Sequence, residues 1–241
     1  NNNAAKPMMP KSVCTGLYED KAGTYWIGTQ EGFARAVYMG SPAKITRLNW
    51  YYNNSASRNS LNYNHVSCFI DDPVSPEKYI WIGTKGGGLN RFDKINGNFF
   101  HLTTKNGLPD DVVYGMLSDD AGNIWGSTNK GIFCLLANKS GDSTQWIFRN
   151  FSKSYGLQDD EFNTGAYAKL QNGLLAFGGV NGMNIFDPRD ILSTGFTPNT
   201  FLTDILINNS PVSAGDKTGV LKENIEHAGS IVLNHLQDIL T

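Results

Sequence analysis

The side chains that could perform chemistry are scattered along this chain and form no familiar catalytic or metal-binding motif. The four histidines lack the spacing of a zinc motif: His65, His101, His227 and His235. No G-x-S-x-G sequence is present, and Lys85-Gly86-Gly87-Gly88 lies at an expected strand-to-strand turn, which disfavours a phosphate-binding loop. The residues therefore predict no enzymatic activity, no cofactor and no metal site.

Paired aspartates come nearest to a glycosidase pattern. The pairs are Asp71-Asp72, Asp110-Asp111, Asp119-Asp120 and Asp159-Asp160. They recur at equivalent turns and linkers of a repeated unit, where aspartate favours tight backbone turns. Catalysis needs a single active site, whereas these pairs recur in several units, so we interpret the carboxylates as turn residues.

Three cysteines, Cys14, Cys68 and Cys134, have neither CxxC nor metal-ligand spacing. A bridge between Cys14 and Cys68 is conceivable because both fall in corresponding strands of neighbouring units. Small buried hydrophobic residues are the favoured interpretation. The cysteines leave the redox compartment open.

Composition and charge narrow the class of protein. The 241 residues are 40% hydrophobic and 12% aromatic, which is typical of a globular protein. The net charge of −2 argues against a nucleic-acid partner, which usually calls for a basic patch. No apolar run reaches the ~18 residues of a membrane span and no signal peptide is recognisable, so we expect no membrane contact by this chain.

A repeated unit organises most of the sequence. Four stretches share an apolar strand, a turn and a second short strand that ends in a small residue and a glycine: Cys14–Phe33, Val66–Leu89, Val112–Ile132 and Asn163–Met183. The second strands carry Trp26, Trp81, Trp125 and Ala176, which are 55, 44 and 51 residues apart. Periods of ~40–50 residues built from short strands are typical of β-propeller blades. We therefore predict an all-β fold with four blades of a larger propeller, packed together by the repeated tryptophan.

Linkers and composition divide the chain further. The linkers before the second, third and fourth blades each carry a leucine expected to fill the crevice between blades: Leu61, Leu108 and Leu157. After Asp187-Pro188 the tryptophan-glycine unit stops, although residues 198–211 and 219–240 still alternate like strands. We predict propeller blades over residues 1–190 and an incomplete β-sandwich over 191–241, since about 45 residues make fewer strands than the ~7 of a sandwich.

One face of the propeller could bind a ligand. In a blade, the turn between the second and third strands emerges on the same face as the linker to the next blade. This face would collect two groups of candidate binding residues: Trp50, Tyr51, Tyr52 and Arg58 from the longest linker, and Lys85, Lys130 and Asn181 from the turns. Aromatic rings stack on sugars, while amides and cations bind hydroxyl or acid groups. Alternatively, Trp50 and Tyr51 pack the outer strand or the interface between blades.

Particular phrases carry a family resemblance. The sequences G-L-P-D-D-V-V-Y-G-M-L-S-D-D-A-G-N-I-W-G-S-T-N-K-G-I and S-L-N-Y-N-H-V-S-C-F-I-D-D resemble the two-component regulator propeller repeat. The phrases Y-G-L-Q-D-D-E-F-N and F-G-G-V-N-G-M-N-I-F-D-P resemble the closing blade of such a propeller. The segment from Pro198 resembles the start of the Y_Y_Y sandwich domain that follows it.

This resemblance implies a sensor. In that family, propellers and a Y_Y_Y domain form the extracytoplasmic half of hybrid two-component systems of Bacteroides-type bacteria, which sense oligosaccharides released from glycans. The resemblance thus implies a periplasmic fragment of an inner-membrane protein whose histidine kinase lies outside this chain. Two other classes stay open: a protein-interaction scaffold, and a polysaccharide lyase or hydrolase with a non-repeating cluster near the ring axis.

The expected partners follow from the same interpretation. They are an oligosaccharide in the intact receptor and either the missing blades or a second copy of the chain, because four blades leave two blade faces without a neighbour. A homodimer is the favoured assembly of the isolated fragment.

Overall fold

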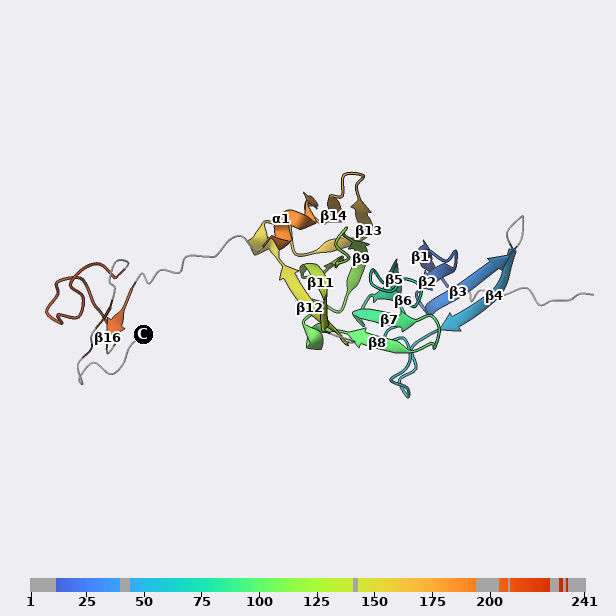
Figure 1. The fold of residues 1–241 in the computed structure, drawn as a ribbon, viewed down its shortest axis with the longest axis horizontal. Helices are drawn as coiled ribbons and strands as arrows, with labels where there is room; N and C mark the ends of the chain where they lie inside the picture. The colour runs from blue at the N-terminus through green and yellow to red at the C-terminus, as the bar shows by residue number, and fades with distance from the viewer. Residues whose placement is uncertain are drawn as a thin grey trace, which may run out of the picture. The chain divides into compact units, whose positions relative to one another are not determined.

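Four antiparallel sheets follow one another along the first part of the chain in the computed structural model (Figure 1). The structure describes residues 12–39, 44–140, 143–193, 204–207, 209–225, 230–231 and 233. Blade 1 contains β1 (Cys14–Glu19), β2 (Tyr25–Thr29), β3 (Gly32–Met39) and β4 (Lys44–Tyr51). Blade 2 contains β5 (Val66–Asp71), β6 (Tyr79–Thr84), β7 (Leu89–Asp93) and β8 (Phe99–Leu102). Blade 3 contains β9 (Val113–Ser118), β10 (Ile124–Thr128), β11 (Gly131–Ser140) and β12 (Ser143–Phe151). Blade 4 contains β13 (Phe162–Lys169), β14 (Leu175–Gly179) and β15 (Gly182–Phe186).

Each sheet is a simple meander in which consecutive strands pair. The inner strands lie in chain order, with β1 against β5, β5 against β9, and β9 against β13. The predicted fold of four propeller blades is therefore confirmed. Two short 3-10 turns, Thr104–Asn106 and Lys153–Tyr155, lie in the linkers that lead from blade 2 to blade 3 and from blade 3 to blade 4.

The repeated tryptophan holds neighbouring blades together, as its recurrence predicts. Its ring is at most 1% exposed in each of blades 1 to 3. The tryptophan rings meet aromatic rings of the next blade at centroid distances of 5.8, 4.9 and 5.1 Å: Trp26 with Phe92, Trp81 with Trp146, and Trp125 with Phe186. Removing such a buried ring typically costs about 3–5 kcal/mol.

An aspartate in the turn after the inner strand anchors each tryptophan. The indole N–H donates to a carboxylate oxygen at 2.9 Å in all three blades: Trp26 to Asp20, Trp81 to Asp72, and Trp125 to Asp119. The other carboxylate oxygen of Asp119 accepts the backbone N–H groups of Ala121 and Asn123 and so shapes the turn. These aspartates are structural residues, in line with their interpretation as turn residues.

Blade 4 lacks both members of this aspartate–tryptophan pair. Leu170 occupies the aspartate position, because its N–H donates to the Leu174 carbonyl as that of Asp20 does to Thr24. Ala176 occupies the tryptophan position and pairs with Ile185, which is 51% exposed. The face of blade 4 that points away from blade 3 is consequently apolar and carries no large ring at the tryptophan position.

A buried ion cluster joins blades 1 and 2. Lys94 has a side chain only 4% exposed, and its Nζ lies 2.9 Å from Asp20 and 2.9 Å from Asp71. It also donates to the Pro76 carbonyl at 2.7 Å. Burial opposes ionisation of Asp20, but hydrogen bonds from Lys94 and Trp26 hold the pKa of this carboxyl below its usual value.

The interblade packing predicted for the linker leucines is observed, and the burial predicted for the cysteines is observed at all of them except Cys14. Leu61 and Leu108 are at most 3% exposed within interblade clusters, and Leu157 packs against the cluster between blades 3 and 4. All three cysteines are free thiols. Cys68 and Cys134 are buried as expected, but the expectation of a buried hydrophobic residue is wrong for Cys14, which is exposed.

The chain divides into two compact units, Asn1–Leu192 and Ser193–Thr241. A short helix, α1 (Pro188–Leu192), ends the first unit. The described part of the second unit contains β16 (Leu206–Ile207), β17 (Ser210–Pro211) and an apolar cluster around Ile205, Val220 and Leu221. Much of the segments 198–211 and 219–240 lies outside the described residues, so the sandwich domain stays a prediction. No helix in the described parts of the chain is long and apolar enough to cross a membrane.

Candidate functional site

The linkers and the turns between second and third strands share one face, as predicted. The Lys85 N–H donates to the His65 carbonyl at 2.8 Å, and the Gly131 N–H donates to the Asp160 carbonyl at 2.7 Å. The Val180 N–H donates to Glu161 in the same manner at 3.2 Å. Backbone hydrogen bonds therefore fix the turns of blades 2 and 4 against the linker that enters the same blade, and the turn of blade 3 against the linker that enters blade 4. These turns and linkers together form what we call the linker face.

Each inner strand of blades 1 to 3 contains a β-bulge near its start. The register with the second strand shifts around Thr15, Ser67 and Tyr114, which occupy equivalent positions. A bulge leaves one residue outside the regular pairing and redirects its side chain, and bulges are common beside functional sites.

Tyr114 departs from the pattern of its two equivalents. The Thr15 and Ser67 hydroxyls donate to the Val66 and Val113 carbonyls, which ties each inner strand to the next. The hydroxyl of Tyr114 instead donates to Asn129 Oδ1 at 2.6 Å. Thr15 and Ser67 make the same contact between neighbouring inner strands, whereas Tyr114 makes a contact that no other blade repeats. Tyr114 is therefore a candidate functional residue.

Tyr114 joins the turns of blades 2 and 3. The Lys85 ammonium lies 5.6 Å from the centroid of the tyrosine ring, within cation–π range. Burial raises the pKa of Tyr114, and the carboxylates of Glu161 and Asp110 raise it further. The phenol therefore stays protonated at neutral pH and serves as a hydrogen-bond donor.

Two linker residues border Lys85. The ring of Tyr63, which is 46% exposed, covers the Gly86-Gly87 turn: a Cβ at Gly86 would lie 3.1 Å from its Cζ atom. His65 is partly buried, and its burial together with the Lys85 charge lowers its pKa below the usual value. At neutral pH this imidazole is uncharged, so it can both donate and accept hydrogen bonds.

We name this group the linker-face cluster. It comprises Tyr63, His65, Lys85, Tyr114, Asn129 and Lys130. Lys130 follows Asn129 directly, is exposed, and places its Nζ 3.7 Å from Asp110. The cluster combines one exposed aromatic ring, two cations, a phenol, an amide and a neutral imidazole. Such a set can bind a polyhydroxylated ligand by stacking and by hydrogen bonds.

The structure brings only part of the predicted site together. Lys85 contacts the ring of Tyr114, and Lys130 directly follows Asn129, which accepts the Tyr114 hydroxyl. Asn181 lies on the turn of blade 4, where its N–H donates to Gln158 Oε1 at 2.6 Å and its amide donates to the Gln158 carbonyl.

The aromatic run of the long linker does not form one patch. Tyr51 stacks on Phe33 with centroids 4.8 Å apart, inside the interface of blades 1 and 2. Trp50 is half-buried against a separate cluster that contains Ile27. Adjacent strand residues point to opposite faces, which separates these two rings. Tyr52, 62% exposed, and Arg58, also exposed, remain accessible in the loop.

Sequence reasoning missed Tyr114 and its hydrogen bond to Asn129. An alignment of the inner strands would have revealed a tyrosine where the other units have threonine or serine. No group of three or more His, Cys, Asp or Glu side chains that could hold a metal ion occurs among the residues whose placement is described.

Comparisons with known proteins extend this description. No protein-family model matches the chain. The extracellular domain of the hybrid two component system BT4673 from B. thetaiotaomicron is 26% identical, with a TM-score of 0.58 over 80% of this chain and 27% of that one. A second structure of a BT4673 extracellular domain gives 25% identity and a TM-score of 0.57. This chain resembles the extracellular sensor region of a hybrid two-component system.

A curated relative supports the same class of protein. Histidine kinase P4 from Formosa agariphila is 27% identical over 130 residues, which are 54% of this chain and 9% of the kinase. The chain thus spans about a quarter of the solved relatives and less than a tenth of the curated one.

Proposed function

We propose that this chain belongs to the periplasmic sensor region of a hybrid two-component histidine kinase and response regulator that detects glycan-derived oligosaccharides. Similarity to extracellular domains of such systems supports the sensor role and the location. The observation that carries the ligand proposal is the linker-face cluster, where Tyr114 breaks the repeat to meet Lys85 and Asn129. The sensor region itself performs no reaction.

Five of the six residues of the cluster have a role in sugar binding. The exposed ring of Tyr63 offers a stacking surface for the apolar face of a sugar. Lys85 and Lys130 bind hydroxyl or carboxylate oxygens, and the amide of Asn129 orients the Tyr114 phenol. The cluster uses turns from blades 2 and 3, so a bound oligosaccharide would bridge two blades.

Signalling follows from differential affinity. A ligand shifts the equilibrium between two receptor conformations only as far as it binds one more tightly than the other. Because the cluster lies across a blade boundary, a bound sugar favours one arrangement of the two blades. The receptor would pass this preference to its kinase and thereby to genes for polysaccharide use.

A polysaccharide lyase is the second candidate, because the cluster does contain a tyrosine, a histidine and an asparagine at one special place. A lyase tyrosine must lose its proton to act as a base. Burial and two nearby carboxylates raise the pKa of Tyr114, which opposes this role. The raised pKa of Tyr114 therefore favours binding over catalysis.

The test measures binding and product formation together. The chain is screened by thermal shift against oligosaccharides from several glycans, each at a concentration about a hundred times the expected Kd, where binding stabilises the folded state by about 2.7 kcal/mol. We expect one oligosaccharide class to bind without being consumed. Lys85→Met and Tyr114→Phe should weaken its affinity by about tenfold or more.

Lys21→Met is the matched control, since Lys21 lies in the β1–β2 turn and not at the linker face. Its affinity should equal that of the unaltered chain. A folded chain that no oligosaccharide stabilises would refute the proposal, and consumption of the sugar would establish the lyase instead.

A further inference from the structure

A cavity of about 340 Å³ lies along the inner strands of all four blades, and we call it the inner-strand cavity. Each inner strand pairs only with the second strand of its own blade among the described strands. Its other edge therefore carries backbone N–H and C=O groups that strand pairing leaves free to bind a ligand. Small-molecule sites commonly have volumes of about 300–1,000 Å³, so this cavity has room for a small ligand.

One wall of the inner-strand cavity is apolar. Four of its side chains occupy the same position in successive inner strands, because each pairs with the residue that follows the repeated tryptophan or, in blade 4, Ala176: Leu17, Phe69, Met116 and Tyr167. Leu117 extends this wall, and Leu17 is 73% exposed. These side chains provide carbon surface against which the C–H groups of a ligand can pack.

Tyr167 differs from the other three side chains because it ends in a hydroxyl group. Its ring extends across β9, where a Cβ at Gly115 would lie 2.0 Å from the Tyr167 Cδ1 atom. No described residue accepts a hydrogen bond from this hydroxyl, and solvent can reach its oxygen. Burial raises the pKa of Tyr167, and the nearby Cys68 raises it further, so the phenol keeps its proton and can donate.

Four more hydroxyl groups line the cavity: Thr15, Ser67, Ser118 and Thr164. Thr15 and Ser67 donate to carbonyl groups of the next inner strand, which leaves their oxygen lone pairs free to accept. The hydroxyls of Ser118 and Thr164 form no hydrogen bond with another described residue. The cavity therefore offers both donors and acceptors to a hydroxylated ligand.

The lining of the cavity carries no unbalanced charge. Lys169 is its only charged side chain, and the Lys169 Nζ atom lies 2.6 Å from the Asp120 carboxylate. A carboxylate, sulfate or ammonium group of a ligand would find no free opposite charge there. Because removal of an unpaired charge from water is costly, the lining favours an uncharged ligand.

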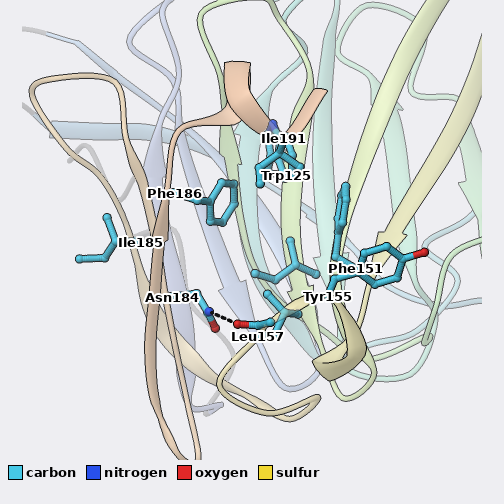
Figure 2. A pocket seen from close by; sticks show the side chains of 10 residues that line it. Trp125, Phe151, Tyr155, Leu157, Asn184, Ile185, Phe186 and Ile191 are labelled. Atoms are coloured by element: carbon cyan, nitrogen blue, oxygen red, sulfur yellow. Dashed lines mark hydrogen bonds between the residues drawn. The ribbon is translucent and has the colours of Figure 1, made fainter. Parts of the chain in front are cut away.

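The cavity of about 210 Å³ between blades 3 and 4 provides a contrast (Figure 2). Its walls are mainly apolar side chains such as Phe151 and Phe186. The Asn184 amide already donates to the Gly156 carbonyl, and the Tyr155 hydroxyl points away from the cavity (Figure 2). Unlike the inner-strand cavity, it offers a hydroxylated ligand no free hydroxyl group.

We propose that the inner-strand cavity binds a small, uncharged, polyhydroxylated molecule of the size of a monosaccharide, and that the Tyr167 hydroxyl donates a hydrogen bond to it. The C–H groups of the ligand pack against Leu17 and Leu117. Its hydroxyl groups bind Ser118, Thr164 and the free edges of the inner strands. This site shares no residue with the linker-face cluster, so it does not depend on the function proposed for that cluster.

The test measures the binding of monosaccharides to the 241-residue chain by ligand-observed NMR titration. The neutral probes are glucose, galactose, mannose, xylose and rhamnose. Glucuronate and galacturonate serve as charged counterparts, because each differs from its neutral sugar only by a carboxylate. We expect saturable binding of a neutral sugar and, since the lining has no free cation, binding of the uronates that is weaker by about tenfold or more.

Protein variants locate the binding site. Tyr167→Phe removes only the phenol oxygen, which binds no described residue, so Tm should not fall while the affinity for the sugar weakens about 3–10-fold. Tyr155→Phe is the matched control, since Tyr155 is 72% exposed, lies outside the inner-strand cavity and should leave binding unchanged. Thr164→Trp fills the cavity from an exposed position and should abolish binding. If Thr164→Trp does not fold, the comparison of the two tyrosine variants still decides the question.

Four results would overturn the proposal. The first three are no saturable binding of any neutral monosaccharide, equal binding of a sugar and its uronate, and unchanged affinity of Tyr167→Phe. The fourth is a sugar whose binding is weakened by Lys85→Met but not by Tyr167→Phe. That result would place the sugar at the linker-face cluster and support the function proposed above, so the two proposals can fail separately.

Discussion

Replacement of Lys94 by methionine tests the contact between blades 1 and 2. Methionine keeps the length and apolar character of the side chain but removes its charge. The variant loses three hydrogen bonds, to Asp20 at 2.9 Å, to Asp71 at 2.9 Å and to the Pro76 carbonyl at 2.7 Å. Two buried carboxylates then remain without their cation.

The expected loss of stability is large. Removing one partner of a buried ion pair costs about 3–5 kcal/mol, since the remaining charge stays buried and uncompensated. For a unit of this size, 1 kcal/mol lowers Tm by about 2–4 °C, so we expect a decrease of about 6–20 °C. Circular dichroism during heating at pH 7 measures this change.

The pH dependence gives a second readout. In the unaltered chain the folded pKa of Asp20 lies below its unfolded value, so this stabilisation is present above about pH 4 and is lost as the pH falls through the folded pKa. Without Lys94, burial should raise the folded pKa of Asp20. Protonation of Asp20 in mild acid then removes the uncompensated buried charge that destabilises the variant. The difference in Tm between the two proteins should therefore shrink as the pH falls from 7 to 4.

A surface ion pair provides the control. Lys169 lies 2.6 Å from Asp120 between blades 3 and 4, but its side chain is 34% exposed and that of Asp120 is 77% exposed. Solvent screens such a pair, so Lys169→Met should change Tm only slightly. The reasoning is refuted if both variants lose the same stability, or if the difference for Lys94→Met grows in acid.

Two further predictions concern the turns and the thiols. Gly131 and Gly156 have similar φ angles of 95° and 90°. Gly156→Ala should cost about 1–2 kcal/mol by urea unfolding, and Gly131→Ala clearly more, because its added Cβ would lie 2.0 Å from the Phe151 carbonyl oxygen. Equal costs would contradict this reasoning. Cys14 should react with a thiol reagent in the folded protein, whereas Cys68 and Cys134 should react only after unfolding, since burial raises the pKa of both thiols. Fast reaction of all three in the native state would disprove their burial.

The parts of the fold that repeat could be predicted from the sequence. Strand alternation, turn glycines and the spacing of Trp26, Trp81 and Trp125 each depend on residues close together in the chain. The third unit illustrates this: the predicted unit Val112–Ile132 contains all of β9 and β10, whereas β11 continues from Gly131 to Ser140. Boundaries at the outer end of a blade are less certain because fewer neighbours constrain them.

The parts that depend on distant residues could not be predicted. Lys94 reaches Asp20 across 74 positions of sequence, and nothing near either residue indicates the pair. The aromatic run of residues 50–52 does not lie on one face, because strand pairing sends Trp50 and Tyr51 to opposite faces of the sheet. Tyr114 escaped notice because its importance lies in a contrast with Thr15 and Ser67, which becomes visible only when the units are compared position by position.

Blade 4 departs from the repeat at two positions, and the loss of the aspartate and the loss of the tryptophan have one physical explanation. A buried aspartate without an indole N–H would lose a hydrogen-bond donor, and a tryptophan without the carboxylate would leave its N–H unpaired. Leu170 and Ala176 avoid both penalties because the two polar partners are absent at once. With Leu170 and Ala176 at these positions, the face of blade 4 that points away from blade 3 is apolar, whereas the corresponding faces of blades 1 to 3 bury a tryptophan ring. In this blade the absence of a fourth strand among the described residues coincides with the absence of the tryptophan.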